Sequence, residues 1–553
     1  MMYPNDSNWS SSIEAPLVIL NEEEITWSDT ADVVVVGLGA AGISAAIEAK
    51  DGGCDVIGID RYVGGGDTAL SGGVFYSGGG TRIQQEAGFD DSPENMFEYL
   101  KQETQGIVSD DTLMRFCNNS VKDLNFLEDN GVEFRATLSP IKTSYPAKPY
   151  YFYYSGNESV LSYSQTATPA PRGHRAFGKG LSGSALYRPL HQSAIKKGVR
   201  MQLQSRVARF VINENKVIIG LELKTIQKPH RSKHARYYQW MNQAKMFLPF
   251  MSAKYRKQVL EMEKECTDTI YVKANKGVVL SCGGFVMNRS MLKHYAPKYK
   301  KAMGLGTTGA DGSGLRLGQT VGGSSAHLSN VSAWRFINPP IAWSQGIVVN
   351  KQGQRFVNEQ CYGAVIGRAM CEDNDGKGYV ILNKKMLKQA YMQSLPTKVW
   401  LFQMFPAYLC MLFASKKGAT LSALAKKMGV PADQLEATVQ QYNEAILNGT
   451  EDAMGKSKEF TQLIDNGPYY ALNVSIDSQF FPLPAITLGG LEVNEETGAV
   501  KDERGVDIPK LFAAGRTAVG IPSNMYVSGL SIADCVFSGR RAGNVLAHHI
   551  NQK

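Results

Sequence analysis

Two short runs rich in valine and isoleucine near the start of the chain have the pattern of buried strands. Residues 31–36 form the first run, which ends at a glycine-rich turn and is followed by an alanine-rich stretch over residues 40–49. Residues 54–60 form the second run and end in an acid. Apolar strands that alternate with a helix are typical of a parallel sheet covered on both faces. The pattern therefore predicts a β-α-β unit at the start of an α/β fold.

Later segments show helical and alternating patterns. Apolar residues at helical spacing predict helices over residues 420–429 and 432–442, which we expect to be core-facing scaffolding. Residues 220–223 and 270–273 have the pattern of a β-ribbon. A basic, aromatic insert, residues 228–265 approximately, separates the two strands of this ribbon.

The glycines after the first strand are spaced for a dinucleotide. Gly37 allows the turn, Gly39 lets the backbone approach a pyrophosphate, and Gly42 lets the helix pack on the strand. Asp60 lies at the spacing of a carboxylate that accepts the ribose hydroxyls, which argues against a 2′-phosphate. Glycines after a strand often serve packing alone, but here the strand, the acid and a second glycine cluster together favour a dinucleotide site.

That second cluster, residues 63–73, favours FAD over NAD. It would bring backbone N–H groups and the small hydroxyls of Thr68 and Ser71 close to a flavin and its ribityl chain. A flexible loop is the alternative interpretation.

The positions of the cofactor motifs predict how the chain is divided. Motifs at both ends of the sequence must meet at one FAD, so the chain has to leave the cofactor domain and return. We expect a Rossmann-like FAD-binding domain in two parts, residues 1–287 and 476–553, with an inserted α+β catalytic or capping domain over residues 288–475. The expected fold class is α/β, with the active site where the cap closes over the flavin.

Composition narrows the class of protein. A chain of 553 residues exceeds the usual size of one hydrophobic core, and 43% hydrophobic and 20% charged residues are ordinary for a folded α/β protein. The net charge of +8 comes without any nucleic-acid recognition motif, so we expect no nucleic-acid partner. The eight cysteines include no CxxC pair, which argues against a metal, iron–sulfur or haem site. Free thiols and a polar N-terminus without a signal peptide predict a cytoplasmic protein.

Two segments suggest contact with a membrane surface. Residues 228–257 mix cations with aromatic residues and methionines, a composition suited to an anionic lipid interface. Residues 399–413 are strongly apolar but are too short, and too interrupted by Pro406, to span a bilayer. If the two lie together, they predict peripheral docking on the inner face of the membrane. The alternative is that each packs on its own domain.

The C-terminal tail carries candidate chemistry. Tyr526 and Ser528 form a Tyr-x-Ser pair directly before Gly529. Hydroxyl groups of this kind are weak acids suited to polarising a ketone or relaying a proton, whereas a dicarboxylate substrate would require arginines and histidines.

Taken together, these motifs resemble the fumarate reductase/succinate dehydrogenase flavoprotein superfamily, and within it the 3-ketosteroid dehydrogenases, most closely the Δ4-(5α) type. The motifs that match the superfamily are the two glycine clusters, residues 276–285, 309–314 and 346–359, and the tail. The ketosteroid branch is suggested by residues 153–158, residues 169–174, Tyr362 and the Tyr526-to-Gly529 segment.

Two departures from other branches are informative. Fumarate reductases place a catalytic arginine a few residues after the Asn-Glu pair, where this chain has Cys361, Tyr362 and Gly363. Arg368 is near enough in sequence to keep that role open, beside a surface or helix-capping role. No histidine lies in the second glycine cluster, where respiratory flavoproteins attach FAD covalently, so we expect noncovalent FAD.

The resemblance implies α,β-dehydrogenation of a 3-ketosteroid, from a 3-oxo-5α-steroid to a 3-oxo-4-ene. It assigns catalysis to Tyr362, Tyr526 and Ser528, with Tyr526 on the carbonyl oxygen and the other two in proton removal and relay. Which of these two is the base stays open. Structural alternatives are that Ser528 caps the following helix and that Tyr362 is an ordinary buried tyrosine.

The residues expected to contact FAD come from all the cofactor motifs. They are Gly37, Gly39, Ala40, Ala41, Gly42, Asp60, Arg61, Gly66, Asp67, Thr68, Ser71, Gly72, Gly73, Val207, Gly283, Gly284, Asp311, Gly515, Arg516, Gly529, Leu530, Ser531 and Ile532. The target of Arg516 and the external electron acceptor are not assigned by the sequence. The alternatives to the leading function are a Δ1-dehydrogenase or a fumarate-reductase-like enoate reductase, and a membrane-associated flavin-binding protein without catalysis.

Overall fold

The computed structural model describes residues 10–245 and 248–548. Its largest feature is a nine-stranded sheet in which β10 (Thr267–Leu280) is central. Three strands follow it in parallel on one side, β2 (Asp29–Val36), β3 (Val56–Asp60) and β7 (Arg200–Leu203). The parallel arrangement matches the predicted β-α-β opening, because α1 (Ala40–Asp51) connects β2 to β3. The predicted α/β fold class is confirmed.

The other strands extend the sheet from the opposite edge of β10. β9 (Ile218–Ile226) pairs antiparallel with β10 and with β8 (Ser205–Asn213), which in turn pairs with β1 (Leu17–Ile19). β21 (Asp507–Ala513) returns from the C-terminal part of the chain to pair parallel with β10, and β20 (Ala499–Lys501) pairs with β21. The ribbon predicted from residues 220–223 and 270–273 is thus present, with Leu221 opposite Val272.

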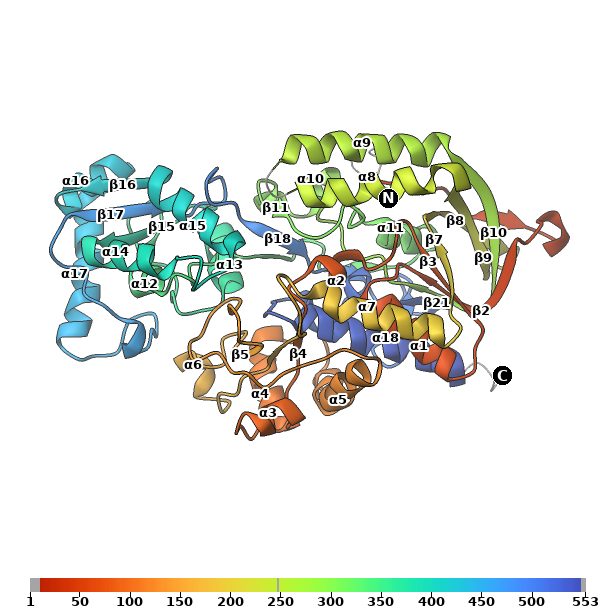
Figure 1. Cartoon of the computed structure of the whole chain (residues 1–553), viewed down its shortest axis with the longest axis horizontal. Coiled ribbons are helices and arrows are strands. Elements are labelled where there is room, and N and C mark those ends of the chain that lie inside the picture. The colour runs from red at the N-terminus through yellow and green to blue at the C-terminus, as the bar shows by residue number, and fades with distance from the viewer. Residues whose placement is uncertain (1–9, 246–247, 549–553) are drawn as a thin grey trace.

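The C-terminal helix packs against the first helix at very short range. A Cβ added to Gly539 of α18 (Leu530–His548) would lie 2.2 Å from the carbonyl oxygen of Ala41, and one on Gly543 would lie 2.5 Å from that of Ala45. Side chains at these positions would therefore push α18 away from α1. Helices α1 and α18, from the two cofactor segments of the chain, thus lie side by side on one face of the main sheet (Figure 1).

A second, four-stranded antiparallel sheet lies at the opposite end of the molecule from the main sheet (Figure 1). Its strands in order are β14 (Ile347–Val349), β15 (Tyr379–Asn383), β17 (Tyr469–Asn473) and β16 (Ser415–Gly418). The surrounding helices are α12 (Ile341–Gln345), α13 (Gly363–Asp373), α14 (Lys384–Gln393), α15 (Leu401–Phe413), α16 (Leu421–Met428) and α17 (Ala432–Leu447). The last two confirm the helices predicted from the periodicity.

The sequence explains where α16 starts and stops. The side chain of Thr420 accepts a hydrogen bond from the backbone of Ala423 and caps α16, and Gly429 ends it with φ of +77°. Leu424, Leu435 and Val439 point into one core with the second sheet.

The division of the chain into domains at residues 288 and 475 stays a prediction.

Smaller elements fill the space between the two sheets. β4 (Val74–Tyr76), β6 (Gly173–Arg175) and β5 (Phe152–Tyr153) form a three-stranded sheet, with α4 (Pro93–Thr104), α5 (Asp110–Asp129) and α7 (Gly183–Lys196) nearby (Figure 1). β11 (Met303–Gly304), β18 (Pro484–Thr487) and β13 (Val331–Ala333) form another. Among the described helices, none combines the length and the apolar character needed to cross a membrane.

Candidate active site

The turn between β2 and α1 presents a helix N-terminus to a pocket. Gly37 has φ of +95°, a conformation that glycine adopts without steric cost. A Cβ on Gly42 would lie 1.9 Å from the carbonyl oxygen of Gly37, so turn and helix are in contact. Gly39 precedes α1 without a capping side chain, and the positive end of the helix dipole faces the pocket. This arrangement suits an anionic group such as a pyrophosphate.

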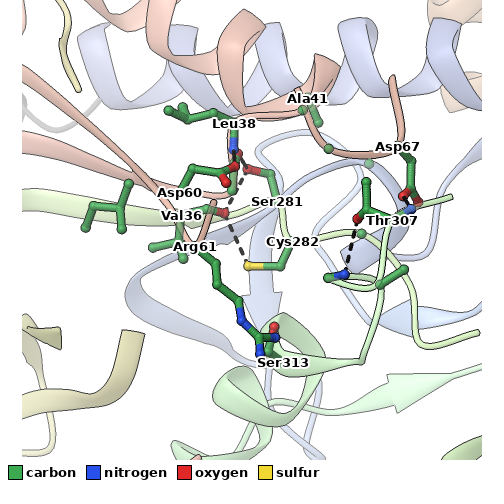
Figure 2. Close-up of a pocket in the computed structure, with 18 of the residues that line it drawn as sticks. Val36, Leu38, Ala41, Asp60, Arg61, Asp67, Ser281, Cys282, Thr307 and Ser313 are labelled. Atoms are coloured by element: carbon green, nitrogen blue, oxygen red, sulfur yellow. Dashed lines mark hydrogen bonds between the residues drawn. The ribbon is translucent and has the colours of Figure 1, made fainter. Parts of the chain in front are cut away.

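Asp60 closes one end of the same pocket. Its carboxylate accepts a hydrogen bond from the backbone N–H of Leu38 at 2.9 Å (Figure 2). It accepts a second from the backbone N–H of Tyr62 at 2.8 Å. Burial raises the pKa of Asp60, and these hydrogen bonds act against that rise. The remaining lone pairs of the carboxylate are available to the hydroxyls of a ribose.

A helical hairpin fixes the two residues after Asp60. It consists of α8 (Arg231–Ala244) and α9 (Pro249–Glu265), which occupy the insert between β9 and β10. Glu263 accepts two hydrogen bonds from the Arg61 guanidinium, at 2.8 and 2.7 Å, and the Tyr238 ring stacks on Tyr62 with centroids 4.1 Å apart. Arg61 also donates to Asp311 at 2.9 Å. The carboxylates of Glu263 and Asp311 therefore hold the Arg61 guanidinium rigidly at the pocket wall.

The contact with the hairpin predicts weaker FAD binding when its charge is removed. We expect Glu263→Gln to raise the Kd for FAD about tenfold, equivalent to roughly 1.4 kcal/mol, because Arg61 loses its charged partner at the adenosine end. Titration of the apoprotein with FAD, followed by flavin fluorescence, measures this. Glu261→Gln on the exposed side of α9 is the matched control. Equal Kd values for the two variants would show that the hairpin does not support the cofactor site.

The opposite end of the pocket is built around Asp67. Its carboxylate forms an ion pair with Arg516 and accepts a hydrogen bond from the backbone of Thr307. This pairing gives Arg516 the partner that the sequence left unassigned. The second terminal nitrogen of Arg516, Nη1, is buried and has no partner within the part of the chain that the structure describes. A buried donor without a partner is costly, so the site fits a ligand that presents hydrogen-bond acceptors there, as a flavin ring does.

More than half of the expected cofactor residues line this pocket. They are Gly37, Gly39, Ala40, Ala41, Asp60, Arg61, Gly66, Asp67, Thr68, Val207, Gly283, Gly515 and Arg516. Sequence reasoning did not include Leu38, Tyr62, Ser281, Cys282 and Thr307, which also line it. The signal for four of them was their position beside Gly37, Asp60 and Gly283, whereas Thr307 lies outside the motifs.

The remaining expected residues lie outside the pocket lining. Gly42 and Asp311 stand behind it, the first in the helix contact and the second holding Arg61. Ser71, Gly72, Gly73, Gly284, Gly529, Leu530, Ser531 and Ile532 are likewise not among its lining residues. Ser71 donates to the carbonyl oxygen of Thr68 at 2.8 Å, which stabilises the second glycine turn. Their contact with FAD stays a prediction.

The three expected catalytic residues come together near Arg516. The rings of Tyr362 and Tyr526 lie 6.4 Å apart between centroids, within a cluster that includes Trp334 and Phe336. Ser528 Oγ lies 3.1 Å from the hydroxyl of Tyr153, a fully buried residue on β5. Tyr153 belongs to the segment that marked the ketosteroid branch but was not predicted as a site residue. Only the fold shows that it lies against Ser528, 375 residues away.

Burial changes the acidity of these hydroxyls. It raises the pKa of Tyr526, an effect that the nearby Arg516 guanidinium reduces. It raises the pKa of Tyr362 further, and the neighbouring tyrosines Tyr526 and Tyr153 add to that rise. Both residues are therefore neutral hydrogen-bond donors around neutral pH, which suits polarisation of a carbonyl oxygen.

A buried network positions the backbone of Tyr362. Its N–H donates to Asn157 Oδ1 at 2.6 Å, and Asn157 Nδ2 donates to Glu103 at 2.7 Å. Burial raises the pKa of Glu103 to about 7. Arg368, by contrast, donates to Asn524 Oδ1 at a long 3.4 Å.

Comparison with known proteins identifies the cofactor family. The family described as the FAD binding domain matches residues 32–529. The chain belongs to this family. It is 39% identical over 507 residues to a 3-oxo-5-alpha-steroid 4-dehydrogenase of Comamonas testosteroni, covering 89% of this chain and 94% of that protein. The predicted FAD cofactor and the resemblance to the Δ4-(5α) branch are thereby confirmed.

Solved structures and more distant relatives agree with this placement. The 3-ketosteroid-Δ4-(5α)-dehydrogenase of Rhodococcus jostii RHA1, solved with 4-androstene-3,17-dione, matches with a TM-score of 0.81 and 29% identity, over 97% of this chain and 100% of that one. A fumarate reductase (cytochrome) of Shewanella frigidimarina is 24% identical over 94% of this chain and 78% of its own length. This family member is an FAD-dependent oxidoreductase of the fumarate reductase-like fold.

Proposed function

We propose that this protein converts a 3-oxo-5α-steroid to the 3-oxo-4-ene steroid. The observation that carries the proposal is the hydroxyl cluster, in which Ser528 contacts Tyr153 beside Tyr362 and Tyr526, at the Arg516 end of the FAD pocket. The apolar side chains around it suit a steroid ring system. The match to steroid dehydrogenases over nearly the whole chain supports the same substrate class.

The residues of the cluster take separate roles in this proposal. Tyr526 donates a hydrogen bond to the 3-oxo oxygen, which acidifies the hydrogen on the adjacent C4. That proton leaves through Ser528 and Tyr362: each hydroxyl takes it up as it releases its own proton, and Tyr153, hydrogen-bonded to Ser528, extends this relay, which ends at solvent. Bound FAD, which we propose is held noncovalently, supplies the hydride acceptor for the C5 hydrogen. Loss of one proton and one hydride leaves the new C4–C5 double bond.

Anaerobic reduction by two steroids tests the substrate and the position of the double bond. We expect 5α-androstane-3,17-dione to bleach the flavin and to yield the 4-ene, identified by mass and NMR. Androst-4-ene-3,17-dione is expected to leave the flavin oxidised. Bleaching by the 4-ene alone, with a 1,4-diene product, would assign the Δ1 reaction instead. No bleaching with either steroid would contradict a steroid dehydrogenase.

We also propose a cytoplasmic location with peripheral contact to the inner face of the membrane. All eight cysteines are unpaired, as thiols are in a reducing compartment. The two segments proposed for contact differ in what they expose. In residues 228–257, which include α8 and the start of α9, the side chains of His234, Tyr238 and Met241 are buried. Those of Trp240, Leu248 and Phe250 are exposed. Residues 399–413 expose a longer apolar surface.

A further inference from the structure

Helix α15 presents a continuous apolar stripe to solvent. Its exposed residues are Leu401, Phe405, Leu409, Leu412 and Phe413, whose exposed fractions range from 39% to 63%. At helical geometry these positions fall within about a third of the circumference. Ala407, Cys410 and Met411 lie on the opposite side of the helix and are buried in one core with the four-stranded sheet. The stripe is thus an outward face of a helix that is already packed on its inner side.

The chain around α15 is strongly basic. Residues 376–432 contain nine lysines and no aspartate, glutamate or arginine. Lys377 pairs with Asp477, and the other eight lysines are exposed. Over residues 10–245 and 248–548, no carboxylate forms an ion pair with any of those eight. Lys398 precedes the stripe and Lys416 and Lys417 follow it, so positive charge without a carboxylate partner among the described residues flanks both ends of the helix.

The N-terminal end of the same helix packs beside a residue of the hydroxyl cluster. Trp400 and Phe402 pack against the group formed by Val74, Tyr145 and Tyr153. Trp400 Nε1 donates to the carbonyl oxygen of Pro146 at 2.9 Å, which fixes the start of the helix there. Tyr153 is the residue whose hydroxyl contacts Ser528. One helix therefore connects an exposed apolar surface with the wall of the candidate active site.

We propose that α15 docks on an anionic lipid bilayer and that the substrate reaches the active site from that bilayer. Apolar side chains enter the headgroup boundary while the lysines contact anionic lipids, which is how interfacial helices bind. The docking follows from the stripe and the charge alone. The route of the substrate rests on the proposed steroid function, because a steroid partitions into lipid.

Flotation of the purified holoenzyme with vesicles tests the docking. We expect binding to vesicles rich in phosphatidylglycerol and little binding to pure phosphatidylcholine. Phe405→Gln combined with Leu412→Gln should lower the partition coefficient by at least tenfold, and Lys416→Gln combined with Lys417→Gln by about tenfold. Leu20→Gln, at a leucine outside the stripe that is more exposed than any stripe residue, is the control, and Phe250→Gln probes the hairpin instead. Unchanged flotation of both α15 variants, or loss in Phe250→Gln alone, would overturn the proposal.

Turnover in two media separates docking from chemistry. With steroid held in cyclodextrin, the α15 variants should match the unaltered protein. With steroid loaded into anionic vesicles, we expect them to be at least several-fold slower. Equal rates from vesicles would overturn the substrate route and leave the docking, while absence of turnover in both media for the unaltered protein would contradict the proposed function rather than the docking.

Discussion

Replacing Tyr526 by phenylalanine is expected to lower steroid turnover by about two to three orders of magnitude while FAD stays bound. The substitution removes the hydroxyl that would polarise the 3-oxo oxygen and keeps the ring, which packs on Trp334 with centroids 5.2 Å apart. The cofactor pocket is lined by other residues and should be unaffected. Stopped-flow measurement of flavin reduction, with the flavin content read from its absorbance, separates the two effects.

Tyr408→Phe provides the comparison for this variant. Its hydroxyl donates to the carbonyl oxygen of Tyr391 between α14 and α15 and does not belong to the hydroxyl cluster, so turnover should change little. Undiminished flavin reduction in Tyr526→Phe would remove Tyr526 from the mechanism. A loss of bound FAD in the same variant would assign the tyrosine to the cofactor instead.

Two glycines of the dinucleotide turn are expected to respond differently to alanine. Gly42→Ala places a methyl group 1.9 Å from the Gly37 carbonyl oxygen, so we expect the apoprotein to lose roughly 1–3 kcal/mol of stability or more, and FAD binding with it. Gly39→Ala meets only Thr68 Oγ1 at 3.6 Å and has an ordinary φ of −80°. Its methyl group lies where the pyrophosphate would approach, so FAD affinity should fall at least about tenfold while apoprotein stability changes by less than about 1 kcal/mol.

Urea unfolding of the two apoproteins and titration with FAD measure both quantities. The pair is its own control, because both variants add one methyl group within four residues of each other. If Gly39→Ala binds FAD as tightly as the unaltered protein, the pyrophosphate does not approach the turn at Gly39. If Gly42→Ala is as stable as the unaltered protein, the contact between turn and helix does not limit the fold.

Local sequence was sufficient to predict the features that a single short segment forms. The turn from Gly37 to Gly42 and the acid at Asp60 belong to one β-α-β unit, whose backbone geometry is dictated within some thirty residues. The helices α16 and α17 were likewise predicted by periodicity, and α16 lies between its caps at Thr420 and Gly429. In these segments the glycine conformations and the hydrophobic spacing leave few alternatives.

Contacts between distant segments required the tertiary structure. The sequence identified Tyr526, Ser528 and Tyr362 through a resemblance but did not place Tyr153 against Ser528, and it left Arg516 without its partner Asp67. It suggested a membrane surface for the insert, whereas packing places Glu263 of α9 on Arg61 at the cofactor pocket.

The physical reason is the difference between local and long-range order. Backbone turns and helical faces follow from neighbouring residues, so the sequence by itself determined the FAD-binding unit, the α/β class and the candidate chemistry. Which side chains meet across hundreds of residues depends on how sheets and helices pack. Packing alone therefore decided that the hairpin braces the adenosine end, that Tyr153 joins the hydroxyl cluster, and that α15 turns its apolar stripe to solvent.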